Sequence, residues 1–87
     1  MANWITINVT KTGIKKGTSN YASCPIARAL RAKGFKDVGV GAVYGWFVYK
    51  GIRNNAYYYW PKKVTEFIRK FDSNKQVSPF TFKVKVS

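Results

Sequence analysis

The chain has 87 residues, of which 46% are hydrophobic and 17% aromatic, and its formal net charge is +13. This length suits one domain spanning residues 1–87, and so apolar a composition excludes a disordered tail, which needs few apolar residues and a high charge. The cationic excess favours contact with a polyanion such as nucleic acid, although a solubility role would also account for it.

Cysteine usage and hydropathy indicate where the protein works. Cys24 is the single cysteine, which excludes an intrachain disulfide and suits a reducing cytosol. The first residues lack a basic segment followed by an apolar one, so we expect no signal peptide. The longest uncharged run, residues 38–49, falls short of the ~20 apolar residues that a membrane helix needs. We therefore expect a cytoplasmic protein with no membrane partner.

The first predicted elements are a strand and a connecting segment. Residues 4–9 alternate between apolar and other side chains, with Ile5, Ile7 and Val9 on one side, which is typical of a half-buried strand. Residues 10–17 carry two glycines and three lysines. They predict a turn or one short helical turn.

A helix is predicted over residues 24–33. Ser23 is the expected N-cap, Pro25 lies in the first turn and Gly34 follows the last residue. The helix dipole accounts for cations near its C-terminal end, so those side chains need no functional explanation. A short strand at residues 38–40 is expected to follow.

Residues 43–60 predict an aromatic hairpin, because two aromatic and β-branched runs flank a centre of Lys, Gly, Arg and Asn. A turn at Lys50-Gly51 would place Tyr44 opposite Tyr57, whereas a longer loop would shift that pairing. A shift of one residue exchanges the two faces, so the sequence leaves open which rings point outward. Both faces carry rings, and only one can be buried under a helix.

A second helix over residues 61–72 and a last strand over residues 80–86 complete the chain. Val64, Phe67, Ile68 and Phe71 form a helical apolar stripe. The order of elements predicts an α+β fold, a two-layer sandwich in which two helices pack on one face of a mainly antiparallel sheet of four to five strands.

The residue inventory argues against an enzyme. The chain contains no histidine, and Cys24 has no histidine or second cysteine to work with. The acidic residues Asp37, Glu66 and Asp72 are too few and too scattered for a carboxylate pair or a metal site. We expect no catalytic residues, no metal and no cofactor.

A nucleic-acid interface has better support, since bases stack on aromatic rings while Lys and Arg contact phosphates. Lys83 and Lys85 fall on the outward side of the last strand. Lys62 and Lys63 lie in the first turn of a helix, where cations oppose the dipole, which indicates either phosphate contact or a tolerated local cost. The predicted phosphate contacts are Lys62, Lys63, Lys83, Lys85 and Arg53, and the predicted stacking residues are Trp46, Tyr57 and Tyr59. Packing within the sheet or a dimer seam would also explain the rings.

The chain resembles a group of small uncharacterised phage and prophage proteins. The matching segments are residues 5–10, Ser23-Cys24-Pro25-Ile26-Ala27-Arg28-Ala29, residues 38–41, Pro61 with residues 67–72, and Ser78-Pro79-Phe80-Thr81-Phe82. The resemblance spans most of the chain and marks a fold, not a site. It implies phage or mobile-element origin and the host cytoplasm, and no activity comes with it.

Two functions follow from these observations. The first is a non-enzymatic nucleic-acid-binding module of low sequence specificity, for DNA or RNA. The second is a phage accessory protein that docks its basic surface on an acidic host protein or defence complex. A homodimer joined through the hairpin is a third possibility beside a monomer.

Overall fold

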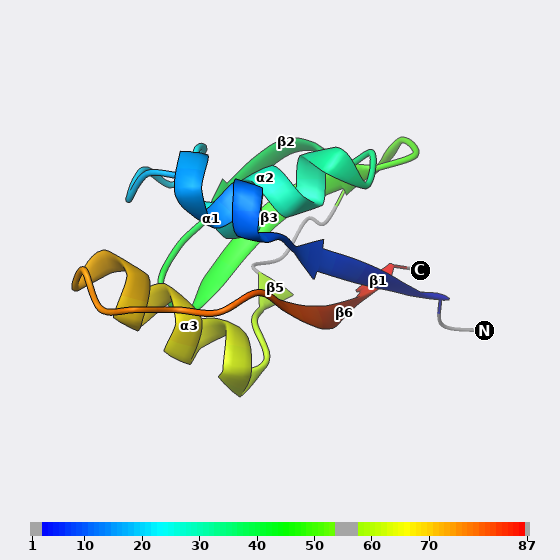
Figure 1. Cartoon of the computed structure of the whole chain (residues 1–87). Helices are drawn as coiled ribbons and strands as arrows, with labels where there is room; N and C mark the ends of the chain where they lie inside the picture. The colour runs from blue at the N-terminus through cyan, green and yellow to red at the C-terminus, as the bar shows by residue number, and fades with distance from the viewer. Residues whose placement is uncertain (1–2, 54–57, 87) are drawn as a thin grey trace.

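The computed structural model describes residues 3–53 and 58–86. In chain order its elements are β1 (Asn3–Val9), α1 (Lys11–Lys16), α2 (Pro25–Ala32), β2 (Lys36–Val40), β3 (Tyr44–Tyr49), β4 (Ile52–Arg53), β5 (Tyr58–Tyr59), α3 (Lys62–Asp72) and β6 (Phe80–Val86). Figure 1 shows α1 and α2 above β1 and β6, and α3 below them. The start of β1 lies beside the end of β6, because Asn3 pairs with Val86. The predicted α+β class is confirmed.

The terminal strands β1 and β6 form a two-stranded antiparallel sheet. Their register places Ile5 opposite Val84 and Ile7 opposite Phe82, so the apolar sides of both strands meet on one face. Because side chains alternate along a strand, the intervening residues face outward. The alternation predicted for both strands is therefore confirmed.

A second antiparallel sheet contains β2, β3, β4 and β5, with β3 paired to the other three. Between Lys36 and Gly39 the pairing of β2 with β3 shifts by one residue. Asp37 lies at this point with φ 50°, a left-handed conformation, so it is the extra residue of a β-bulge. The bulge leaves Lys36 and Gly39 on the same face.

The hairpin turns at Lys50-Gly51, because Tyr49 pairs with Ile52. Both turn residues have positive φ, 50° and 78°, as a type I′ turn requires. Farther along, Tyr44 lies opposite Tyr59 and not opposite Tyr57, since the pairing shifts by two residues between β4 and β5. A shift of two keeps every side chain on the same face.

The helices begin and end close to the predicted residues. The expected short turn after the first strand is a helix, α1, capped by Thr10, whose Oγ1 accepts from the Gly13 N–H at 3.0 Å. The N-cap of α2 is Cys24 and not Ser23, because Pro25 occupies the first helical position and makes the preceding residue the cap. α3 begins after Pro61, which offers no side-chain cap.

One hydrophobic core joins both sheets and two of the helices. It is formed by buried side chains of β1, α2, β2, β3, α3 and β6, including Ile7, Leu30, Val40, Phe47, Val64, Phe67, Phe82 and Val84. The strands thus divide into two sheets around this core instead of one sheet. Tyr58 links them, because its hydroxyl accepts a hydrogen bond from the Lys85 N–H at 2.8 Å.

Candidate nucleic-acid interface

Lys83 and Lys85 lie where the sequence predicted them, on the outer face of the β1–β6 sheet. Both side chains are exposed, and their cross-strand neighbours are Thr6 and Trp4. Trp4 is 57% exposed. A lysine opposite an exposed indole gives this outer face one place where cation and ring are neighbours.

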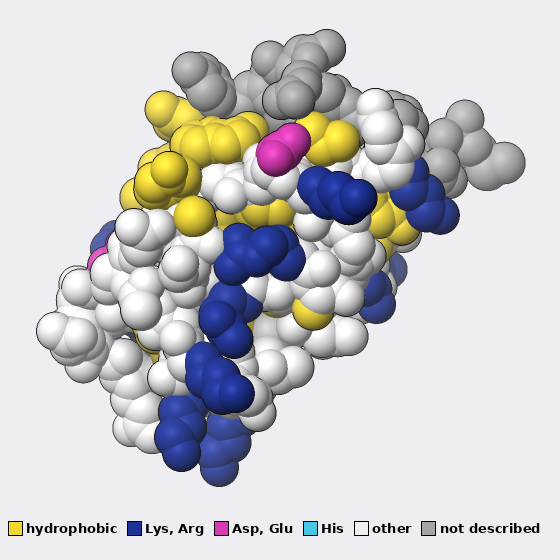
Figure 2. All heavy atoms as spheres, turned by 90° about the horizontal axis from the view of Figure 1, so that it is seen from above, with side chains coloured by type: hydrophobic (Ala, Val, Ile, Leu, Met, Phe, Trp, Pro, Cys, Tyr) yellow, Lys and Arg dark blue, Asp and Glu magenta, His cyan; other side chains and the backbone are white. Residues whose placement is uncertain are grey.

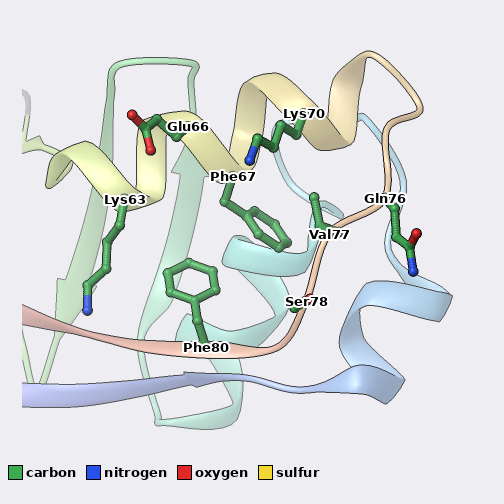
Figure 3. Close-up of a pocket in the computed structure, with 8 residues that line it drawn as sticks. All are labelled: Lys63, Glu66, Phe67, Lys70, Gln76, Val77, Ser78 and Phe80. Carbon is green, nitrogen blue, oxygen red and sulfur yellow. The ribbon is translucent and has the colours of Figure 1, made fainter.

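Lys62 and Lys63 open α3, which has no acidic residue in its first turn. The Lys62 Nζ lies 4.0 Å from the Glu66 Oε1, but both side chains are well exposed, so this ion pair contributes little. Figure 3 shows Lys63 extending from α3 toward β6. Both lysines therefore remain available to an anionic ligand, although local helix electrostatics disfavours them.

An open groove of about 290 Å³ runs between α3 and the segment that enters β6 (Figure 3). Phe67, Val77 and Phe80 form its apolar part, while Lys63, Glu66 and Lys70 supply charges of both signs. Small-molecule sites need a few polar groups converging on one point. Here the charged side chains project in different directions, so the groove carries no specific chemistry.

Trp46 and Tyr59 lie on the outer face of the second sheet, with Tyr44 and Tyr21. Tyr44 and Tyr59 are directly opposed, with ring centroids 5.9 Å apart. Trp46 follows two residues after Tyr44 on β3 and lies 6.0 Å from Tyr21. The four residues are 68% (Tyr59), 58% (Tyr21), 38% (Trp46) and 37% (Tyr44) exposed. We call these four residues the aromatic face.

Glycine allows the aromatic face to form. Gly39 lies opposite Trp46, and a Cβ added to it would lie 2.1 Å from two indole carbons. The indole therefore lies over the Gly39 backbone, which supports it from the core side. On the inner face, Gly45 likewise lies against an indole, because its missing side chain makes room for Trp60.

Two of the predicted residues, Tyr57 and Arg53, belong to the hairpin. Tyr57 lies outside the described residues, as does the side chain of Arg53. The backbone of Arg53 pairs with Val48, whose other neighbour across the sheet is the exposed Lys36. Val48 and Trp46 share a face, so Lys36 lies on the same side as the aromatic face.

Sequence reasoning missed a cationic surface on α1 and α2, which pack against each other. These helices contain no acidic residue, and their cationic residues are Lys11, Lys15, Lys16, Arg28 and Arg31. We call these five residues the basic row. Figure 2, viewed from the side where α1 and α2 lie, shows Lys and Arg side chains in a line across this face. The sequence signal for this surface was the spacing of Lys11 and Lys15, because residues four apart lie on the same side of a helix.

The basic row and the aromatic face meet at the loop before α2. The Arg31 guanidinium donates a hydrogen bond to the Ala22 carbonyl. The next residue back, Tyr21, receives the Val40 N–H on its carbonyl and places its ring beside Trp46. In Figure 2, hydrophobic side chains gather beside the line of cations. Cations and rings thus belong to adjoining surfaces.

Cys24 is not an activated nucleophile. Burial raises the pKa of its thiol, and the hydrogen bond from the Ala27 N–H to Sγ, 3.4 Å long, opposes this only in part. Within residues 3–53 and 58–86, no group of three metal-ligating side chains comes together. Nor does any helix in that part of the chain have the length and apolarity to cross a membrane.

No protein-family model, curated protein or solved structure matches this chain. The resemblance to phage and prophage proteins therefore stays a prediction.

Proposed function

We propose that this protein is a non-enzymatic nucleic-acid-binding module of low sequence specificity that acts in the cytoplasm of a phage host. The supporting observation is the basic row, which adjoins the aromatic face at the loop before α2, and Figure 2 shows a line of cations beside hydrophobic side chains on this side of the molecule. Lys and Arg contact phosphates regardless of base sequence, so the ligand is recognised mainly by its charge.

The phosphate contacts come from two groups of cations. The first is the basic row, and the second is the set predicted from sequence: Lys62, Lys63, Lys83, Lys85 and Arg53. We assign most of the phosphate contacts to the basic row, because it adjoins the aromatic face and its two helices contain no acidic residue.

The test is the salt dependence of binding. Each phosphate that the protein neutralises contributes about −0.9 on duplex DNA, or about −0.7 on a single strand, to the slope of log K against log[salt]. Fluorescence anisotropy with labelled DNA and RNA should give a steep negative slope. A slope near zero, or no binding in dilute salt, would refute the proposal.

Two double variants of equal charge compare the two groups. Lys15→Gln with Lys16→Gln removes two cations from α1, and Lys83→Gln with Lys85→Gln removes two from β6. We expect the first variant to lose more affinity and to have the shallower salt slope. The reverse order would assign the interface to β6.

A protein partner is the second candidate, because two rings of the aromatic face are more than half exposed, Tyr59 at 68% and Tyr21 at 58%. Exposed aromatic clusters are common at the centres of protein interfaces. An acidic host protein would remain bound to the chain after nuclease treatment of a host lysate. Loss of the retained material on nuclease addition favours nucleic acid, and a clean monomer in sedimentation would exclude a homodimer through the hairpin.

A further inference from the structure

We infer that the ligand is a single strand of nucleic acid, DNA or RNA, whose bases stack on the aromatic face. This inference rests on the proposed function and specifies its ligand. Its basis is the way the rings of Tyr21, Tyr44, Trp46 and Tyr59 are held, together with the cations around them.

Neither pair of neighbouring rings in the aromatic face is stacked face to face. Tyr21 and Trp46 are inclined by 39°, and Tyr44 and Tyr59 by 60°, so neither pair is stacked. A stacked pair would already occupy the π surface that a base needs. The rings come from two paired strands and one loop tied to β2, so the sheet holds them at set separations.

The rigid support of Trp46 favours stacking further. Its indole rests on Gly39, yet 38% of the residue stays exposed. A ring fixed before the ligand arrives loses little side-chain freedom when a base stacks on it. Base–aromatic stacking tolerates any sequence because every base has a π face, in agreement with low specificity.

These rings discriminate between single and double strands. In a duplex the base faces are covered by neighbouring base pairs, and only base edges are accessible in the grooves. Rings on a sheet face can stack only on bases that are unpaired and splayed out. A duplex could therefore contact the cations but not use the aromatic face.

Cations adjoin the aromatic face at two places. Lys36 is exposed on the same sheet face, and Arg31 lies beside Tyr21 through its bond to the Ala22 carbonyl. Asp37, the single acidic residue in the described strands, is the extra residue of the bulge. A strand lying over the rings would have Lys36 and the basic row within reach of its phosphates.

The experiment compares affinities for a labelled single-stranded DNA, a single-stranded RNA and the duplex of each, at equal length and salt. Tyr59→Ala removes a ring of the aromatic face from a residue that is 68% exposed. The control, Trp4→Ala, removes a ring from the other sheet, from a residue that is 57% exposed. Alanine substitution of a stacking ring lowers affinity by about 5- to 150-fold per base. We expect Tyr59→Ala to weaken single-strand binding within this range, and Trp4→Ala to change it less than 2-fold.

Tryptophan fluorescence gives a readout that needs no ring removed from the aromatic face. In a Trp4→Phe variant the remaining tryptophans are Trp46 and the buried Trp60. A single strand stacked on Trp46 should quench the emission, whereas a duplex at the same degree of binding should not. Quenching by single-stranded DNA and RNA alike, or by one alone, would support the inference, and quenching by one alone would also identify the sugar.

The possible failures are distinguishable. Salt-dependent binding with equal affinity for single strands and duplexes, no quenching and no effect of Tyr59→Ala would overturn this inference and leave the proposed function standing. Absence of binding to all four probes would overturn both, as would a protein partner that remains bound after nuclease treatment.

Discussion

At the scale of single residues, two glycines provide the space that two tryptophan side chains occupy. Gly39 and Gly45 each lie where a side chain would collide with an indole, Trp46 on the outer face and Trp60 on the inner face. Close packing of this kind needs no unusual backbone angle at either glycine. Trp46 can therefore lie against the sheet and still be reached from solvent, whereas Trp60 is sealed in the core.

The first prediction follows from this packing. Gly39→Ala should lower the free energy of unfolding by about 1–3 kcal/mol, because the new methyl group forces the Trp46 indole off the strand. In a Trp46→Ala background the same substitution should cost much less, since the obstruction is gone. Urea unfolding of the four proteins measures both effects. Equal costs in the two backgrounds would show that the indole does not lie over Gly39.

Cys24 gives a prediction about pH. Burial raises the pKa of this thiol above its ordinary value. Between the unfolded and folded pKa values the folded state holds the proton and the unfolded state releases it, so stability falls as the pH rises through that window. The stabilisation is fully present at neutral pH.

Urea unfolding at about pH 7 and about pH 10 tests this. Wild-type protein should lose more stability on going to the higher pH than a Cys24→Ser variant, which keeps a capping oxygen but has no thiol. Every other side chain is the same in both proteins, so the difference between them isolates Cys24. The same loss in both would mean that the thiol is not buried.

At the scale of elements, α3 combines a strong apolar stripe with an N-terminus that has neither a side-chain cap nor an acidic residue. Val64, Phe67 and Ile68 are buried, which fixes the helix against the core. Pro61 gives no cap, and two lysines stand where the dipole prefers an acid. Tertiary packing therefore stabilises this helix more than its own ends do.

Lys63 and Lys70 line the same groove at opposite ends of α3 and form a matched pair. Lys63→Gln should raise the free energy of unfolding by about 0.3–1 kcal/mol and Lys70→Gln should lower it by a similar amount, because the helix dipole acts oppositely at the two ends. Denaturant unfolding measures the change. If Lys63 contacts phosphate, its substitution should also weaken nucleic-acid binding more than that of Lys70. Equal losses of affinity would remove Lys63 from the interface.

At the scale of the whole molecule, charge opposes compactness. The chain has a formal charge of +13, and the fold measures 37 × 21 × 20 Å. At about 0.01 M salt the Debye length is about 30 Å, so cations on opposite sides of the short axes still repel. At about 0.1 M it falls to about 10 Å, and most of that repulsion is screened.

We therefore expect the unfolding temperature to rise clearly as salt increases from about 0.01 to about 0.1 M. A variant in which Lys15, Lys16, Lys75 and Lys83 are replaced by glutamine should show a smaller rise, since it has less repulsion to screen. Differential scanning calorimetry across the salt series measures both proteins. A flat or falling temperature in the wild type would contradict the electrostatic account.

Local patterns were sufficient for most of the elements. The alternation of Ile5, Ile7 and Val9, and the stripe of Val64, Phe67 and Ile68, depend only on which residues meet the core, so the predicted strand and helix are confirmed. The turn at Lys50-Gly51 was one of the two turns that the sequence allowed, because glycine accepts positive φ. The predicted N-cap of α2, Ser23, was wrong by one position, because Cys24 caps the helix.

The tertiary structure alone decided which surfaces adjoin. No local pattern reveals the bulge at Asp37 or the two-residue shift that sets Tyr44 opposite Tyr59, because register depends on partner strands. The neighbourhood of Arg31, Tyr21 and Trp46 depends equally on contacts between distant segments. The amino-acid sequence by itself thus determined the elements and the excess of positive charge, which are sums over nearby residues. Folding decided where the charge and the rings meet, since that depends on packing between residues far apart in the chain.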